Sequence, residues 1–364
     1  MGINFLLKKE GLDNIRKLNT MQINKIASYI SEKLCTSFPE LHLSQSRLFM
    51  QLSRLNMYIA HMQDNQSSAK YVYGNNSIFF NENLDLNNID IAAIHECIHY
   101  LQEFKDQKGK LIRLGLYDLE KKSGLALNEA AVQIIACRTL EKPTYESVTY
   151  YGMSFISESP EFYPLECALV SQMTFFTGDE ALYFSTLYSS PMFERNFKSS
   201  STENTYQEIQ TALDKLMKLE TELSKLTSKY QISTVEKANQ LQKQIDSKKK
   251  SITHLCIKIQ NKIIDTCFKK NFTKLETFDD IREFENNLIE FEKYLILPEN
   301  YNYFSEFKNK ITQDINFKKD QIIKYGKSID IPKEYGAYLP TVVTTKKLSK
   351  IQEILKNIKN FIFG

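Results

Sequence analysis

Several residue types are scarce in this sequence. Its 364 residues include no tryptophan, five histidines and six cysteines, and no two cysteines form a CxxC pair. The lack of closely spaced cysteines argues against both a disulfide framework and a cysteine-rich zinc module. We therefore expect the cysteines to be small apolar core residues in a cytoplasmic protein.

Long apolar runs are missing as well. No uninterrupted run reaches the ~18 residues of a membrane span, and the longest candidate, 165–188, is broken by Asp179 and Glu180. The first nine residues do not resemble a signal peptide, because their apolar run is short and is followed by charge. We expect neither a signal peptide nor a transmembrane segment, and export by a non-classical route stays open.

Charge of a single sign is not in excess. The chain carries 47 Lys and Arg residues against 44 Asp and Glu residues, a net charge of +3. This balance gives no electrostatic footprint for nucleic acid, so we predict no nucleic-acid partner. The length leaves room for two domains.

The clearest chemical signal lies in residues 91–101, IAAIHECIHYL. Residues four apart share a face of a helix, ~5–6 Å from each other, so His95 and His99 can bind one metal ion. Glu96 then lies beside the metal, where a general base can act on a metal-activated water. The flanking residues are all uncharged, which predicts a largely buried helix. Here the chain resembles the zincin metallopeptidases, which implies Zn²⁺ as the cofactor.

A catalytic zinc usually takes three protein ligands and a water. The metzincin pattern is excluded because Gln102 and Lys105 stand where it requires Gly and His. The next histidine is His254, in sequence of a different kind, so we predict a downstream carboxylate as the third ligand. Glu129 is the best candidate, because it lies in a predicted helix of small residues that can pack closely. The remaining candidates are Asp118, Glu120 and Glu141.

The segment Asn128-Glu129-Ala130 resembles the third-ligand segment of gluzincins, including lethal-factor-like toxins. One departure is Gln133, which stands where thermolysin-like enzymes have an Asp that supports a histidine ligand. Gln133 can still accept a hydrogen bond from such a histidine, but it brings no charge. Gluzincins commonly use a tyrosine hydroxyl to assist the oxyanion, and we predict Tyr150 or Tyr151 for that role.

The periodicity predicts an α+β, predominantly helical fold. We expect a helix over 11–36, strands at 57–60, 69–73 and 77–80, and a metal-binding helix with Asp90 or Asn88 as its N-cap. Two more helices are expected at 161–177 and 179–188. In the family it resembles, an edge strand of the small sheet pairs with extended substrate.

The sequence changes character near residue 200. The polar run 198–202 leads into apolar stripes with coiled-coil-like spacing, and interruptions at 231–234 and 297–298 predict antiparallel helices. We predict three regions: a zincin-like domain at 1–198, a long-helix domain at 203–326 and a tail at 327–364. The long-helix domain would bind substrate or a protein partner. The basic amphipathic stretch 346–364 would dock on the protein itself or, less favoured, on a membrane surface.

These patterns lead to two hypotheses. The first is a zinc-dependent peptidase acting on a peptide or protein, with His95, His99 and Glu129 as ligands and Glu96 as the base. The second is a non-enzymatic helical interaction protein whose zincin-like part is structural or inactive. Glu96 favours the first hypothesis, because a purely structural zinc site has no use for a base.

Overall fold

The computed structural model describes residues 11–62, 68–73, 76–140 and 146–325. The predicted tail helix at 346–364 and the candidate Glu141 lie outside these residues. Within them the chain forms eleven α-helices and three small sheets. The prediction of a predominantly helical α+β fold is therefore confirmed.

The largest sheet has four strands in the order β1-β2-β4-β3. Its strands are β1 (Leu12–Lys17), β2 (Asn56–Met62), β3 (Ala69–Val72) and β4 (Ser77–Asn81). β2 and β4 are parallel, while β1 and β3 pair antiparallel with their neighbours. The three predicted strands are thus present as β2, β3 and β4. They precede the helix of residues 91–101, as predicted, and β3 lies at the edge of the sheet.

The helix predicted over 11–36 is wrong in its first part. Residues 12–17 form β1, in which Leu12 pairs with Met62, and helix α2 (Thr20–Ser37) begins only afterwards. Asn19 caps α2 in a reciprocal capping box with Gln22. Because this box satisfies the first free N–H groups, it fixes the helix start that hydrophobic spacing alone placed too early.

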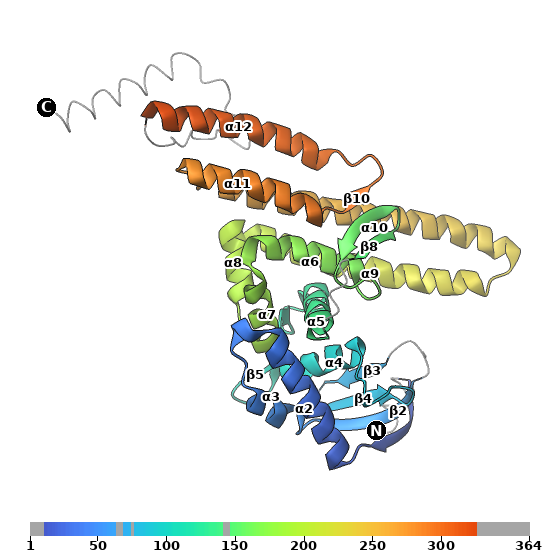
Figure 1. Cartoon of the computed structure of the whole chain (residues 1–364). Helices are drawn as coiled ribbons and strands as arrows, with labels where there is room; N and C mark the ends of the chain where they lie inside the picture. Colours follow the sequence, from blue (N-terminus) through green and yellow to red (C-terminus); the bar gives the residue numbers. More distant parts are fainter. Residues whose placement is uncertain (1–10, 63–67, 74–75, 141–145, 326–364) are drawn as a thin grey trace. The chain divides into compact units, whose positions relative to one another are not determined.

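Two helices carry the motif residues. Helix α4 (Ile91–Leu101) is capped by Asp90, as predicted, whose side chain accepts a hydrogen bond from the Ala93 N–H at 2.9 Å. Helix α5 (Leu125–Thr139) packs on α4, and α4 in turn packs on β3 and β4, so α4 lies between the sheet and α5 (Figure 1). Between the two helices the chain forms the small sheet of β5 (Glu103–Lys105), β6 (Leu111–Leu114) and β7 (Tyr117–Asp118).

Four further helices lie in this part of the chain. Helix α3 (Gln45–Leu52) packs on α2 and α4, while α6 (Pro164–Thr177) and α7 (Asp179–Tyr188) pack on α5. Helix α8 (Met192–Ser200) packs on α6 and α7. α6 and α7 match the two helices predicted at 161–177 and 179–188. A hairpin of β8 (Glu146–Tyr150) and β9 (Met153–Ser157) precedes α6.

The long helices are α9 (Glu203–Gln231), α10 (Val235–Phe272), α11 (Phe278–Phe291) and α12 (Tyr303–Tyr325). The chain divides into two compact units, Met1–Lys270 with Glu290–Tyr301, and Asn271–Ile289 with Asn302–Gly364. This division differs from the predicted boundary near residue 200, because α9 and α10 belong to the same unit as the site. The Ser/Thr run is a helix junction: Thr202 caps α9 through the Thr205 N–H, and Ser201 is buried.

The segment after α11 returns to the first unit. Strand β10 (Leu297–Pro298) pairs with β9, and two buried glutamines bind the backbone just before it. Gln260 donates to the carbonyl of Ile296 at 3.0 Å and accepts from its N–H at 2.7 Å, while Gln172 donates to the carbonyl of Tyr294 at 2.8 Å. These bonds tie the backbone of Tyr294 and Ile296 to α6 and α10.

In the second unit, a buried lysine on α12 binds the backbone at the end of α10 and in its connection to α11. Lys318, 5% exposed, donates to the carbonyls of Phe272 and Leu275 at 3.0 and 2.8 Å. Lys319 on the next position pairs with Glu285 at 2.7 Å.

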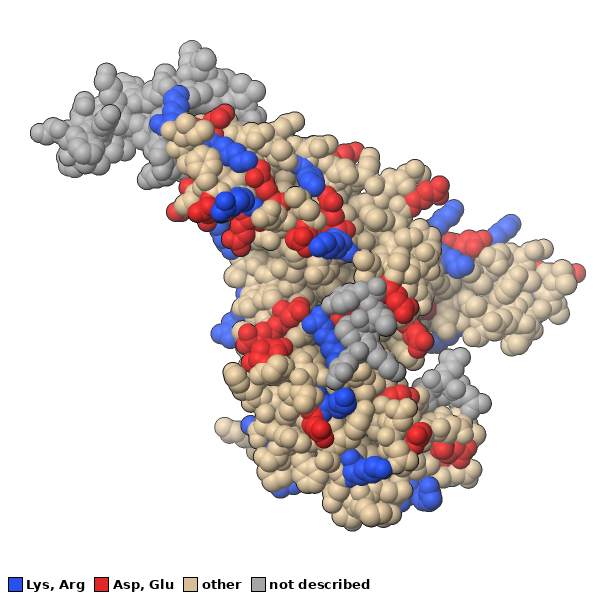
Figure 2. Space-filling view, viewed as in Figure 1, with Lys and Arg blue, Asp and Glu red and all other residues tan. Residues whose placement is uncertain are grey.

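Basic and acidic side chains are interspersed over the described part of the face in Figure 2, as the near-balanced composition implies. None of the helices in the described part of the chain has the length and apolarity to cross a membrane.

Candidate metal centre

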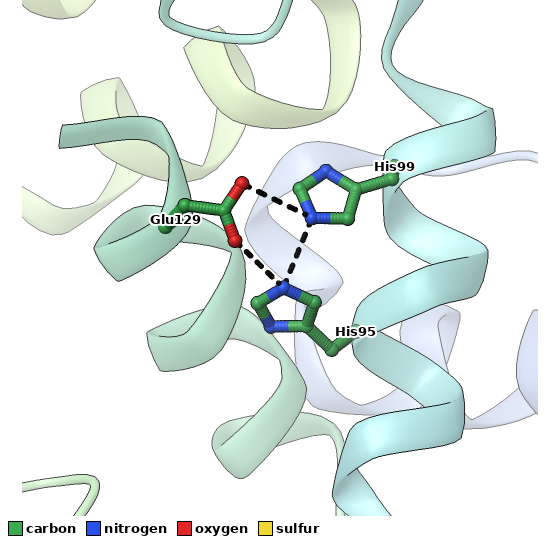
Figure 3. Close-up of side chains that lie close together, drawn as sticks. All are labelled: His95, His99 and Glu129. Atoms are coloured by element: carbon green, nitrogen blue, oxygen red, sulfur yellow. Dashed lines mark hydrogen bonds and ion pairs between the residues drawn. The ribbon is translucent and has the colours of Figure 1, made fainter. Parts of the chain in front are cut away.

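His95, His99 and Glu129 converge where α4 faces α5 (Figure 3). The Nε2 atoms of the two histidines lie 2.9 Å apart, and Glu129 oxygens lie 3.2 Å from His95 Nε2 and 3.5 Å from His99 Nε2. A tetrahedral ion with bonds of ~2.0–2.2 Å separates its ligand atoms by roughly 3.3–3.6 Å. The three side chains can therefore hold one metal ion with only small adjustments.

The electrostatics of this group suit a cation. Burial raises the pKa of Glu129, but the adjacent His99 and His95 outweigh it and hold that pKa below its usual range. Burial lowers the pKa of His99, but the charge and hydrogen bond of Glu129, together with the charge of Glu96, outweigh burial and raise that pKa overall. Glu129 therefore stays ionised and attracts positive charge, which a proton on His99 or a metal ion can supply.

A hydrogen-bonded chain orients His95. Its Nδ1 lies 2.9 Å from Gln133 Oε1, and Gln133 Nε2 donates to Ser159 Oγ at 3.0 Å. Ser159 Oγ donates onward to the carbonyl of Phe162 at 2.6 Å. With the Gln133 amide fixed this way, His95 carries its proton on Nδ1 and turns the Nε2 lone pair to the centre. This is the position predicted for Gln133.

Glu96 lies on α4 beside the two histidines and is tied to the edge strand. Its Oε2 accepts a hydrogen bond from the Tyr71 N–H on β3 at 2.7 Å. The Tyr71 hydroxyl donates to Glu103 at 2.6 Å, just beyond the end of the same helix. These two contacts fix β3 along α4, so the edge strand runs beside the candidate centre.

Helix α5 receives its N-terminal cap from a distant residue. Asp214 on α9 accepts hydrogen bonds from the Gly124 and Ala126 N–H groups at 2.9 and 2.8 Å. Its carboxylate satisfies two free N–H groups and complements the positive end of the helix dipole. Glu129 lies on the second turn of this helix, so α9 helps to position a candidate ligand.

The other carboxylates proposed as the third ligand have different roles. Asp118 accepts from the N–H groups of Glu120 and Lys121 in a turn. Glu120 is exposed and pairs with Lys110 at 3.1 Å. Neither belongs to the converging group.

Tyr150 and Tyr151 are not placed at the centre. The Tyr150 hydroxyl donates to the carbonyl of Pro160 at 2.8 Å, and the hydroxyl of Tyr151 lies by Glu220 on α9. Tyr163 lies at the centre instead: its ring stacks on His95 with centroids 6.2 Å apart. Burial raises the pKa of Tyr163, and the charges of Glu129 and Glu96 raise it further, so its hydroxyl stays protonated.

Sequence reasoning missed Tyr163 and Gln102. Tyr163 adopts a left-handed conformation (φ 52°) immediately before Pro164, a local strain of the kind found at functional sites. No spacing pattern in the sequence indicates that Tyr163 lies at the centre. Gln102 lies three residues after His99, on the same helical face, and that spacing could have indicated its contact with the histidine.

Comparisons with protein-family models, with curated proteins and with solved structures found no match to this chain.

Proposed function

We propose that the chain is a zinc-dependent peptidase. The observation that carries the proposal is the convergence of His95, His99 and Glu129, with Glu96 held beside them. Two imidazoles and one carboxylate form a ligand set typical of catalytic zinc, which leaves a fourth position for water. When bound there, zinc would lower the pKa of that water towards ~7.

Each neighbouring group has a role in peptide hydrolysis. Glu96, oriented by the Tyr71 N–H, takes the proton of the attacking water and passes it to the leaving amine. The protonated Tyr163 hydroxyl, on the ring that stacks on His95, donates to the developing oxyanion. The outer edge of β3 offers backbone groups to an extended peptide, a form of strand addition.

The non-enzymatic alternative gains no specific support from this arrangement. A structural zinc site usually takes four protein ligands, whereas the converging group within the described residues has three. Glu96 also has no ligand role in it.

The test is Glu96→Gln. The variant should bind zinc as the wild type does, because all three ligands remain, and should hydrolyse a peptide library at least ~10²–10⁴-fold more slowly. Zinc content is measured by metal analysis, and hydrolysis by mass spectrometry with and without chelator. Peptidase activity that survives in Glu96→Gln or in chelator would contradict the proposal.

A further inference from the structure

Gln102 contacts the second histidine from the side away from the candidate centre. Its Nε2 lies 2.7 Å from His99 Nδ1, and the side chain is buried, with 1% exposure. Its backbone is held as well, because the Gln102 carbonyl accepts from Ser189 Oγ at 2.6 Å. Gln102 therefore has little freedom except rotation of its terminal amide.

The other end of this amide lies among acceptors. Gln102 Oε1 has no hydrogen-bond partner among the described residues. A Cβ placed on Gly115 would lie 2.4 Å from this oxygen, 2.4 Å from Asn128 Oδ1 and 3.0 Å from the carbonyl of Thr186, so three acceptors converge. Asn128 Oδ1 accepts from the Leu116 N–H at 3.0 Å, which fixes its own orientation. An N–H donor at the position of Gln102 Oε1 would suit these neighbouring acceptors better than another oxygen does.

Building on the proposed zinc site, we propose that Gln102 is a positioning residue for His99, with its side-chain amide rotated by 180° from the orientation described above. Its Nε2 then donates towards Asn128 Oδ1 and the Thr186 carbonyl, and its Oε1 accepts from His99 Nδ1–H. This rotation turns a donor, instead of an unpartnered acceptor, towards these oxygens. It also fixes the proton of His99 on Nδ1 and leaves the Nε2 lone pair for the metal.

Gly115 makes room for this arrangement. Any side chain there would overlap both the Gln102 amide and Asn128, and the positive φ of 53° is a second reason for glycine. Gly115 thus supports a metal ligand that it does not touch. Gln133 and Gln102 would then act alike, each holding one histidine in the tautomer that a metal requires.

The first test reads the His99 tautomer in the wild-type sequence, with one variant used only to assign its signals. With only five histidines in the chain, ¹⁵N-labelled histidine in the metal-free protein gives few signals, and His99→Gln assigns those of His99. The neutral His99 ring should carry its proton on Nδ1. A neutral ring protonated on Nε2 would overturn the proposal, whether or not the protein hydrolyses peptides.

The second test measures zinc affinity by competition with a chromophoric chelator. Gln102→Leu should weaken zinc binding ~10–100-fold, because His99 Nδ1–H would be buried without an acceptor. Gly115→Ala should weaken it in the same direction by displacing the amide. The matched control is Gln260→Leu, which removes another fully buried glutamine far along the chain and should leave the affinity unchanged in the folded protein.

Wild-type affinity in Gln102→Leu would refute the positioning role. Equal weakening in Gln260→Leu would also refute it, because the effect would then come from general loss of stability. If the wild type bound no zinc, the proposed function would fail, while the tautomer measurement would still decide the role of Gln102.

Discussion

Asp214 offers the sharpest test of how the long helices support the candidate centre. Its carboxylate accepts from two N–H groups in the first turn of α5, at 2.9 and 2.8 Å. Asp214→Ala leaves both groups without that acceptor. Losing a helix cap costs about 0.5–2 kcal/mol, and a hydrogen bond to a charged group contributes about 1.5–3 kcal/mol. Since water can replace part of this, we expect a loss of about 2 kcal/mol in the free energy of unfolding.

The measurement is urea unfolding followed by circular dichroism, with chelator present so that metal binding does not add to stability. At about 2–4 °C per kcal/mol, the midpoint of thermal unfolding should fall by about 4–8 °C. The matched control is Glu208→Ala, on the same helix, which removes an exposed ion pair with Lys262 and should change stability by no more than ~0.5 kcal/mol. A loss as small as the control's in Asp214→Ala would show that α9 does not support α5.

Two further predictions concern other carboxylates. Glu129→Ala should abolish zinc binding and hydrolysis, which metal analysis and peptide assays measure. Glu120→Ala, at an exposed position, is the control and should keep both. Zinc retained in Glu129→Ala would contradict the ligand assignment. Burial, and then the charge of Glu220, raise the pKa of Glu166 well above its usual range. The protonated form of Glu166 therefore stabilises the folded state fully at pH values below the unfolded carboxyl pKa of ~4.3. This contribution to the free energy of unfolding is lost as pH rises through the pKa of Glu166 in the folded state. Glu166→Gln, which stays neutral, should therefore gain stability relative to wild type in urea titrations as pH rises from 5 to 8, and an unchanged difference would refute this.

Most residues of the candidate centre could be predicted from local patterns in the sequence. His95, Glu96 and His99 could be read because helical spacing is a property of neighbouring residues, and Glu129 followed by elimination and from the small residues around it. Tyr163 could not be predicted, because its contact with His95 joins residues far apart in the sequence and depends on tertiary structure. Tyr150 and Tyr151 were chosen for residue type alone, and the hairpin turns them elsewhere.

The fold shows the same limit. Strands β2, β3 and β4 follow from their residue patterns, but the cap that Asp214 gives α5 joins residues about 90 positions apart and leaves no local trace. The Ser/Thr run near residue 200 was read as a linker from its composition. Thr202 is a helix cap there, and caps and linkers use the same residues.

The return of residues 294–298 to the first unit has a consequence for synthesis. Gln172 and Gln260 are buried, and the backbone groups they bind belong to Tyr294 and Ile296. A ribosome working at about 5–20 residues per second needs roughly 15–60 s to translate the 301 residues that end this unit. Until then the nascent chain already carries all three residues of the candidate metal centre, but the two glutamines lack the backbone groups of Tyr294 and Ile296. The N-terminal unit therefore matures late, and premature termination before residue 294 would leave it incomplete.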